Sequence, residues 1–402
     1  MNAPPRRDAA HGSSVETSVP RPQLRFELAL AVAGKAAAAF GTIGFASLAP
    51  FVRDEFDLSA VGVGGIMGMI FLGALIATIP GGRLTDRVRA GRMLGGCLLA
   101  LAVALGLVAA APSAVLFFLA ISVVGLAMGA GDPATNVLVS MNVSRRRRGL
   151  LMGVKQTGLT LGGLLGGLVL PSLAAATSWR VAVAAPIAAC VAIGLFGFWV
   201  AGAVLVRSER APEPVRATSL LGIGTYGFFM AGIQISVLSY LAVYLVDQED
   251  MTATKAGLAI AVALAGATVG RIVWGVISDR LFHSRLLALQ LAAFGAAVAL
   301  AVLSVAGARA VLWPVLFLLG FCAVGWNTVY VTVAAESVPV SSVGKATGEA
   351  LFFSYAGCVS VPPLLGLIHD GTSSWLVTWL AAAAVALVAL AVCRAWASRT
   401  QR

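Results

Sequence analysis

Long apolar runs, separated by short polar segments, make up most of this sequence. A helix that crosses the hydrocarbon core of a membrane needs about 20 apolar residues, and twelve runs are long enough to supply one. A β-barrel would instead show segments that alternate between apolar and polar positions, and these runs do not alternate. The pattern predicts an all-α membrane protein with helices at 27–51, 60–81, 93–112, 114–141, 149–174, 181–205, 219–246, 256–277, 286–306, 310–335, 346–368 and 375–395.

Two sets of residues recur in the two halves of the chain. At an offset of 193, Gly64, Gly73, Gly82, Asp86, Arg87 and Arg92 are matched by Gly257, Gly266, Gly275, Asp279, Arg280 and Arg285. At an offset of 195, Gly149, Gly153 and Gly162 are matched by Gly344, Gly348 and Gly357. A parallel repeat of six plus six helices is known in transporters. The repeat predicts two pseudo-symmetric six-helix bundles at 27–205 and 219–395, a disordered cytoplasmic tail at 1–26, a cytoplasmic linker at 206–218 and a second tail at 396–402.

The composition favours a membrane protein over a soluble one. Hydrophobic residues make up 59% of the chain and charged residues only 11%, whereas a soluble domain carries about 25% charged residues. Of the 28 Lys and Arg, 21 fall in the tails and in the loops on the same side as the N-terminus, and four fall in the opposite loops. This bias follows the positive-inside rule. It predicts a multi-pass protein of the cell (inner) membrane with both termini in the cytoplasm, and it explains the net charge of +11 without a nucleic-acid partner.

The segment at 81–92 (GGRLTDRVRAGR) and its counterpart at 274–285 (WGVISDRLFHSR) carry a family resemblance. The chain resembles the major facilitator superfamily, whose loop between the second and third helices reads G-x-x-x-D-R-x-G-R-R/K. The resemblance covers about 24–396 and implies a network that stabilises the outward-open state and breaks as the bundles rock. We expect Gly82 and Gly275 to allow tight helix packing; the alternative is a loop with ordinary topology charges. The expected gating residues are Gly82, Asp86, Arg87, Arg92, Gly275, Asp279 and Arg280.

Five charged residues lie within the apolar runs: Lys35, Asp132, Lys155, Arg271 and Glu349. A charge there costs roughly 2.5–3.5 kcal/mol on insertion scales. Arg271 precedes Asp279 by eight residues, about 12 Å along a helix, which puts it near a central cavity. It is similar to the substrate-binding Arg of the superfamily's oxalate–formate and monocarboxylate branches, and a guanidinium can hold a carboxylate by two hydrogen bonds. The alternative is a structural Arg paired with Asp132 or Glu349.

The other buried charges have two interpretations each. Lys35 and Lys155 lie on helices that line the cavity in the superfamily, and an excess of positive charge favours an anionic substrate; alternatively, each snorkels to the inner face. Asp132 and Glu349 are candidates for carrying a coupling proton, or are fixed counter-ions. Neutral polar residues can also line a cavity, and on polarity we rank Gln156, Gln234 and Asn327 ahead of Asn136, Tyr226, Tyr240, Trp326, Tyr330 and Tyr355.

These residues predict a secondary active transporter that moves a small organic anion, a carboxylate, by alternating access with proton coupling. The alternative is drug or metabolite efflux by proton antiport. Antiporters of the superfamily carry an Arg in the fourth helix, where this chain has Gly125, and a Pro in the fifth, where it has Gly163. An enzyme is not expected, since His11, His283 and His369 fall in the tail or loops. We expect a monomer in a lipid bilayer, with no cofactor and no metal.

Overall fold

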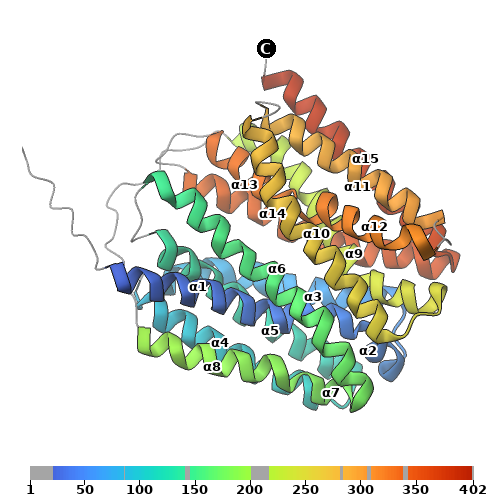
Figure 1. The fold of residues 1–402 in the computed structure, drawn as a ribbon, viewed down its shortest axis with the longest axis horizontal. Coiled ribbons are helices and arrows are strands. Elements are labelled where there is room, and N and C mark those ends of the chain that lie inside the picture. Colours follow the sequence, from blue (N-terminus) through green and yellow to red (C-terminus); the bar gives the residue numbers. More distant parts are fainter. Residues whose placement is uncertain are drawn as a thin grey trace, which may run out of the picture.

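The computed structural model describes residues 21–85, 87–140, 145–200, 217–280, 284–305, 309–337 and 343–400, and its elements there are helical. The N-terminal half, blue to green in Figure 1, lies below the C-terminal half, yellow to red. The elements are α1 (Arg21–Thr42), η1 (Gly44–Leu48), α2 (Ala49–Phe56), α3 (Ala60–Thr85), α4 (Ala90–Ala110), α5 (Ala114–Ser140), α6 (Arg145–Ala176), α7 (Trp179–Ala182), α8 (Ala184–Val200), α9 (Ala217–Glu249), α10 (Ala253–Arg280), α11 (Arg285–Val305), α12 (Arg309–Leu319), η2 (Gly320–Val324), α13 (Asn327–Glu336), α14 (Val343–Thr372) and α15 (Trp375–Thr400).

Twelve spans in the described residues are long and apolar enough to cross a membrane, which confirms the sequence prediction. Three of them contain more than one element: the first joins α1, η1 and α2, the sixth joins α7 and α8, and the tenth joins α12, η2 and α13. The outermost helices exceed their predicted bounds, because α1 begins at Arg21 and α15 continues to Thr400. Most of the predicted linker at 206–218 lies outside the described residues, but 217 and 218 belong to α9. Most of the N-terminal tail at 1–26 also lies outside them, whereas 21–26 belong to α1 and 396–400 of the second tail belong to α15.

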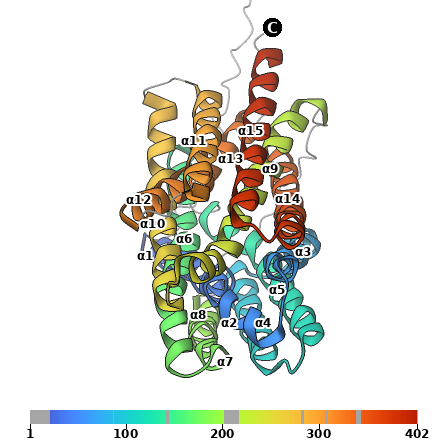
Figure 2. The same ribbon diagram turned by 90° about the vertical axis from the view of Figure 1, so that its right-hand side faces the viewer.

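The two halves meet mainly through two pairs of helices. The N-terminal half consists of α1 to α8 and the C-terminal half of α9 to α15; α3 packs against α14, and α6 packs against α10. Figure 2, a quarter turn from Figure 1, shows the same two groups of helices one above the other.

Repeated glycines occupy equivalent places in the two halves. A Cβ added to Gly64 of α3 would meet the backbone of Pro362 in α14, and one added to Gly257 of α10 would meet Gly167 and Pro171 in α6. These two glycines therefore allow the close approach of helices between the halves. Gly73 and Gly266 do the same within each half, against α5 and α12. Small residues at helix interfaces are a general feature of membrane proteins, because they let backbones approach closely.

The third matched pair does not behave as the sequence analysis expects. Among the described residues, a Cβ on Gly275 would meet nothing within 4 Å, and one on Gly82 would meet only a Pro133 side-chain carbon at 3.9 Å. The expectation of tight packing at Gly82 and Gly275 is therefore wrong. The adjacent Gly81 makes the close contact in the N-terminal half, with the backbone of Ala130. Trp274 stands at the equivalent position of the other half and donates its Nε1 hydrogen to the carbonyl of Phe321.

The two ends of the molecule carry opposite charge. At the end where α1 begins and α15 finishes, exposed arginines gather, and we call this the basic end: Arg83, Arg87, Arg89 and Arg92. At the other end carboxylates predominate, and we call this the acidic end: Asp54, Glu55, Asp57, Asp247, Glu249, Asp250 and Asp370.

Polar contacts tie the two halves together at the acidic end. Arg53 donates to Asp247 at 2.5 Å. The Asp370 carboxylate at the end of α14 accepts the backbone N–H groups of Ala60 (2.9 Å) and Val61 (3.1 Å) at the start of α3. The first N–H groups of a helix have no partner within the helix and favour a negative charge. Asp370 therefore caps a helix of the opposite half and holds this end closed.

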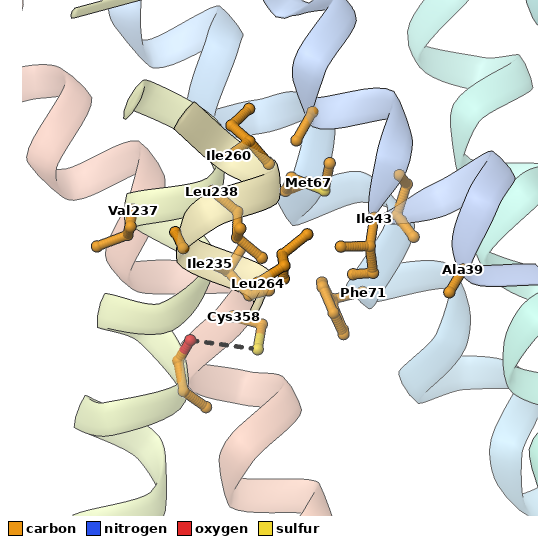
Figure 3. Close-up of a cluster of buried hydrophobic side chains, with 14 of the residues drawn as sticks. Ala39, Ile43, Met67, Phe71, Ile235, Val237, Leu238, Ile260, Leu264 and Cys358 are labelled. Carbon is orange, nitrogen blue, oxygen red and sulfur yellow. Dashed lines mark hydrogen bonds between the residues drawn. The ribbon is translucent and has the colours of Figure 1, made fainter. Parts of the chain in front are cut away.

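An apolar layer lies between the halves (Figure 3). Its side chains are buried and come from both halves: Ile43, Met67 and Phe71 from the first, and Ile235, Leu238, Ile260, Leu264 and Cys358 from the second. A Cβ on Gly163 would lie 2.8 Å from Ile43 and 2.9 Å from Leu264, so both side chains pack against this glycine.

Candidate functional site

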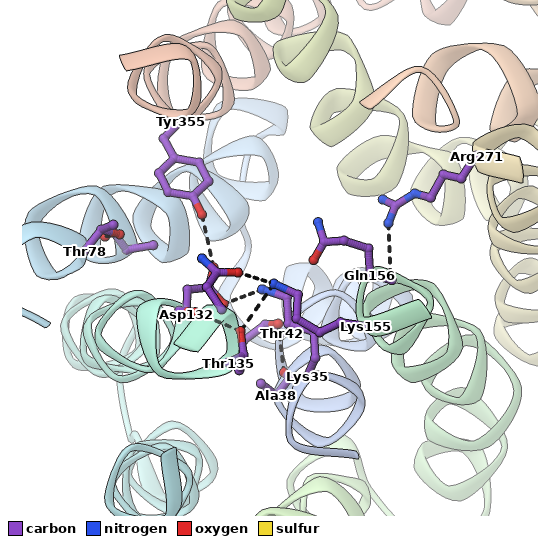
Figure 4. Close-up of polar contacts among 12 residues, drawn as sticks. Lys35, Ala38, Thr42, Thr78, Asp132, Thr135, Lys155, Gln156, Arg271 and Tyr355 are labelled. Atoms are coloured by element: carbon purple, nitrogen blue, oxygen red, sulfur yellow. Dashed lines mark hydrogen bonds and ion pairs between the residues drawn. The ribbon is translucent and has the colours of Figure 1, made fainter. Parts of the chain in front are cut away.

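An ion pair between Lys35 of α1 and Asp132 of α5 lies at the centre of a buried polar group (Figure 4). Lys35 is only 9% exposed. The second carboxylate oxygen of Asp132 accepts a hydrogen bond from the hydroxyl of Tyr355 in α14, at 3.2 Å. Since α14 belongs to the C-terminal half, Asp132 joins the two halves. Asp132 acts as the counter-ion of Lys35 here, and this pairing is compatible with either role that the sequence suggests for it.

Lys155 of α6 has neutral partners. Its Nζ donates to Asn136 Oδ1 at 2.5 Å and to Thr135 Oγ1 at 3.4 Å, and the residue is 5% exposed. Thr135 and Asn136 follow Asp132 by three and four residues, so the helical repeat brings all three to one face of α5. A Cβ on Gly158 would lie 3.2 Å from the Cβ of Lys35, and this close approach of α6 to α1 brings the two lysines together.

Arg271 of α10 reaches the site from the C-terminal half. It is 7% exposed, and its guanidinium donates to the backbone carbonyl of Gln156 in α6 at 3.1 Å. Its Nε is buried without a hydrogen-bond partner. Among the described residues, no carboxylate lies within ion-pair distance of this guanidinium. The alternative of an Arg paired with Asp132 or Glu349 is therefore not what the structure shows.

Together these residues leave an excess of positive charge. We call Lys35, Asp132, Lys155, Arg271 and Tyr355 the charged cluster; it holds three cationic side chains and one carboxylate. Burying a charge without an opposite charge is costly, and a cluster of one sign in a low-dielectric interior attracts the opposite sign. The cluster can therefore hold an anion between the two halves.

The structure changes the ranking of the neutral polar residues. Among the described residues, no contact joins Gln234 or Asn327 to the charged cluster, and Gln156 contributes its backbone carbonyl. Tyr355 and Asn136, which the sequence analysis ranks lower, are direct partners of Asp132 and Lys155. Thr135 was missed altogether. The spacing of three and four residues from Asp132 is a signal that could have found Thr135 and Asn136, whereas nothing local points to Tyr355.

Three aromatic candidates of the C-terminal half pack against one another. Tyr226, Trp326 and Tyr330 are fully buried and contact one another, with ring centroids 5.1–6.4 Å apart. The hydroxyls of Tyr226 and Tyr330 donate to backbone carbonyls of Leu289 and Ala350. Their polar groups are thus satisfied within the core.

The expected gating residues are only partly described. Asp86 lies outside the described residues, as do the side chains of Asp279 and Arg280. Arg87 and Arg92 are exposed at the basic end. Glu349, the second candidate proton carrier, is half-buried and precedes Tyr355 by six residues, about 9 Å along α14. The gating and proton-carrying roles stay predictions.

Two helical halves that meet around a buried charged cluster define a class of membrane protein, the secondary transporters built from parallel repeats. The model of the Major Facilitator Superfamily matches residues 31–362. The chain therefore belongs to this superfamily, which is one of transporters and not of enzymes.

Similar proteins agree with this assignment. The chain is 25% identical to the hexuronate transporter of Bacillus subtilis, over 86% of this chain and 88% of that protein. It is 26% identical to the gentisate transporter of Corynebacterium glutamicum, over 88% of this chain and 84% of that protein. Its fold matches the crystal structure of a bacterial homologue of the human lysosomal transporter Spinster in an inward-facing and occupied conformation, with a TM-score of 0.79 and 14% identity, covering 94% of this chain and 98% of that one.

Proposed function

We propose that this protein moves a small organic anion, a carboxylate, across the cell membrane by alternating access, with protons as the coupling ion. The observation that carries the proposal is Arg271, a buried guanidinium at the boundary between the halves with no carboxylate partner among the described residues. The two relatives named above are called transporters of hexuronate and of gentisate, which are both carboxylates.

Each cation of the charged cluster has a role in this proposal. Arg271 holds the substrate carboxylate through two parallel hydrogen bonds, and Lys155 and Lys35 supply further positive charge from the N-terminal half. Lys155 is the better placed of the two lysines, since its present partners are neutral, whereas Lys35 is paired with Asp132. An anion bound between Arg271 and Lys155 would link the two halves, as alternating access requires. Gln156, beside Lys155, is the candidate for a further polar contact.

Proton coupling is assigned to Asp132, with Glu349 as the second candidate. Asp132 accepts hydrogen bonds from both Lys35 and Tyr355, which lie in opposite halves. A proton on Asp132 would remove the charge that holds Lys35 and weaken the contact with Tyr355. The protonation state of one carboxylate would then change the contact between the halves.

The orientation completes the proposal. Because basic loops face the cytoplasm in membrane proteins, we assign the basic end, with both termini, to the cytoplasmic side of the cell membrane. The acidic end, where Asp370 and the pair of Arg53 and Asp247 join the two halves, then faces outward. We propose that the protein is a monomer and that this conformation is the inward-facing one.

The test compares wild-type protein with Arg271→Gln, purified in detergent and reconstituted in liposomes. A ligand at 100 times its dissociation constant adds about 2.7 kcal/mol to stability, so carboxylates should raise the melting temperature of the wild type. Arg271→Gln should lose this shift and abolish flux while still folding. Arg89→Gln, an exposed Arg at the basic end, is the control for loss of one positive charge.

Two results would contradict the proposal. Normal carboxylate flux by a well-folded Arg271→Gln protein would remove Arg271 from the site. Stabilisation only by bulky cations or neutral drugs would replace anion transport with efflux, and Arg271 would then be a structural charge.

A further inference from the structure

The apolar layer lies about two helical turns from the charged cluster, toward the acidic end. On α10, Leu264 precedes Arg271 by seven residues, which is about two turns or 10 Å along one face. Ile43, the residue directly after α1, follows Lys35 by eight residues, about 12 Å along the helix axis. Gly163, against which Ile43 and Leu264 both pack, follows Gln156 by seven residues on α6. Three helices therefore present a polar group toward the basic end and an apolar contact about two turns further toward the acidic end.

A fourth contact brings the two regions together. The ring of Phe71, a member of the apolar layer, lies 5.7 Å from the ring of Tyr355, whose hydroxyl binds Asp132. Tyr355 thus has its polar tip in the charged cluster and its ring against the layer. A molecule that reaches the cluster from the basic end would meet an apolar surface with its far end.

Several neutral polar groups around the cluster are already engaged within the protein. The hydroxyls of Thr42, Thr78 and Thr135 donate to the carbonyls of Ala38 (2.9 Å), Ala74 (2.6 Å) and Asp132 (2.8 Å). The side-chain oxygen of Asn136 accepts from Lys155. A substrate with many hydroxyls would lose its hydrogen bonds to water here and find few replacements, and an unpaired buried polar group is costly.

From this arrangement we propose that the substrate is an amphipathic carboxylate, whose acid group binds the charged cluster while an apolar or aromatic body packs against Ile43, Phe71 and Leu264. The inference rests on the proposed function and narrows it. A polyhydroxylated sugar acid of the same charge is the ligand that this site should bind more weakly, because each hydroxyl that is buried without a partner is costly.

The first experiment uses the unmodified protein and four probes in thermal-shift titrations: benzoate, hexanoate, glucuronate and benzamide. Benzoate, hexanoate and glucuronate carry the same charge, hexanoate and glucuronate have the same number of carbon atoms, and benzamide is the neutral analogue of benzoate. Benzoate and hexanoate should bind at least about tenfold more tightly than glucuronate, and benzamide should bind more weakly than benzoate.

The second experiment changes the layer. Leu264→Thr should weaken benzoate binding by about fivefold or more and leave formate binding unchanged, since formate is too short to reach from the cluster to the layer. Leu258→Thr is the matched control on the same helix, because Leu258 is 43% exposed. This control should bind both acids as the wild type does. If Leu264→Thr fails to fold, the relative affinities of the four probes for the wild type test the proposal without it.

The outcomes separate this inference from the proposed function. Glucuronate binding as tightly as benzoate would overturn the amphipathic substrate and leave anion transport intact. An equal loss of formate and benzoate binding in Leu264→Thr would also overturn it, since the layer would then serve packing alone. Binding of benzamide or cations with no carboxylate binding would overturn both proposals.

Discussion

The buried lysines of the N-terminal half bind partners in their own half, whereas Arg271 of the C-terminal half binds a backbone carbonyl across the interface. The helix packing, in contrast, is alike in the two halves, since Gly73 and Gly266 each allow a neighbouring helix of their own half to approach closely. At the same offset of 193, Arg271 corresponds to Thr78, whose hydroxyl bonds its own helix. The two halves thus share helix-packing positions but differ in the polar side chains that they carry.

This difference separates charges that support the fold from a charge available to a ligand. Lys35 neutralises Asp132, so either one without the other leaves an uncompensated buried charge. Arg271 neutralises no carboxylate among the described residues, so its loss leaves none unpaired. Substitutions in the two halves should therefore have opposite consequences for stability and binding.

The largest expected effect is that of Lys35→Met. Removing one partner of a buried ion pair costs about 3–5 kcal/mol, because the Asp132 carboxylate is left without its counter-ion. The unfolding free energy in detergent measures this loss. The double variant Lys35→Met with Asp132→Asn should recover most of it, since no unpaired charge then remains. A single variant as stable as the wild type would show that the pair does not support the fold.

Because the packing glycines are repeated, substituting them should destabilise the protein equally in the two halves. Gly73→Ala and Gly266→Ala should each lose about 1–3 kcal/mol of stability, because the added Cβ meets the backbone of a neighbouring helix. Gly82→Ala and Gly275→Ala are the controls, and each should gain up to about 1 kcal/mol, since alanine favours a helix and the space is open. Thermal unfolding of the four variants measures these changes in stability. A loss of stability confined to one half would show that Gly73 and Gly266 are not equivalent.

Arg271→Met should leave stability equal to that of the wild type or up to about 2 kcal/mol higher, because replacing a buried charge by an apolar side chain is often neutral or stabilising. Carboxylate binding should disappear in the same protein. Paired thermal-shift measurements with and without ligand test both points. A strong destabilisation would make Arg271 a structural charge and remove the contrast between the halves.

The smallest expected effect is at the acidic end. Asp370→Asn weakens a cap between the halves worth about 1 kcal/mol, so the ratio of open to closed molecules at this end should rise roughly fivefold. A cysteine introduced at the buried Val63 reports this opening as faster maleimide labelling. Asp250→Asn, an exposed residue at the same end, is the control and should label at the original rate. Equal rates in all three proteins would show that Asp370 does not hold the halves together.

The features that could be predicted depend on residues that are close together in the sequence or repeated at a fixed offset. The twelve spans follow from the length of the apolar runs, and the roles of Gly64 and Gly257 between the halves are consistent with their repetition at a fixed offset. The partners of the buried charges are remote in the chain. Asp132 lies 97 residues from Lys35 and 223 from Tyr355, and Asp370 lies 310 residues from Ala60. No periodicity connects residues at such distances.

The sequence by itself determined that lipid is the solvent of this chain, that twelve helices cross it and that charges are buried within them. Those properties depend on the free energy of transferring each segment into hydrocarbon, which is nearly a sum over neighbouring residues. Only the tertiary structure decided that Lys35 is neutralised, that Lys155 has neutral partners and that Arg271 has no carboxylate partner among the described residues. The reason is that the energy of a buried charge depends on which groups lie within a few ångströms of it, and packing between distant helices sets those distances.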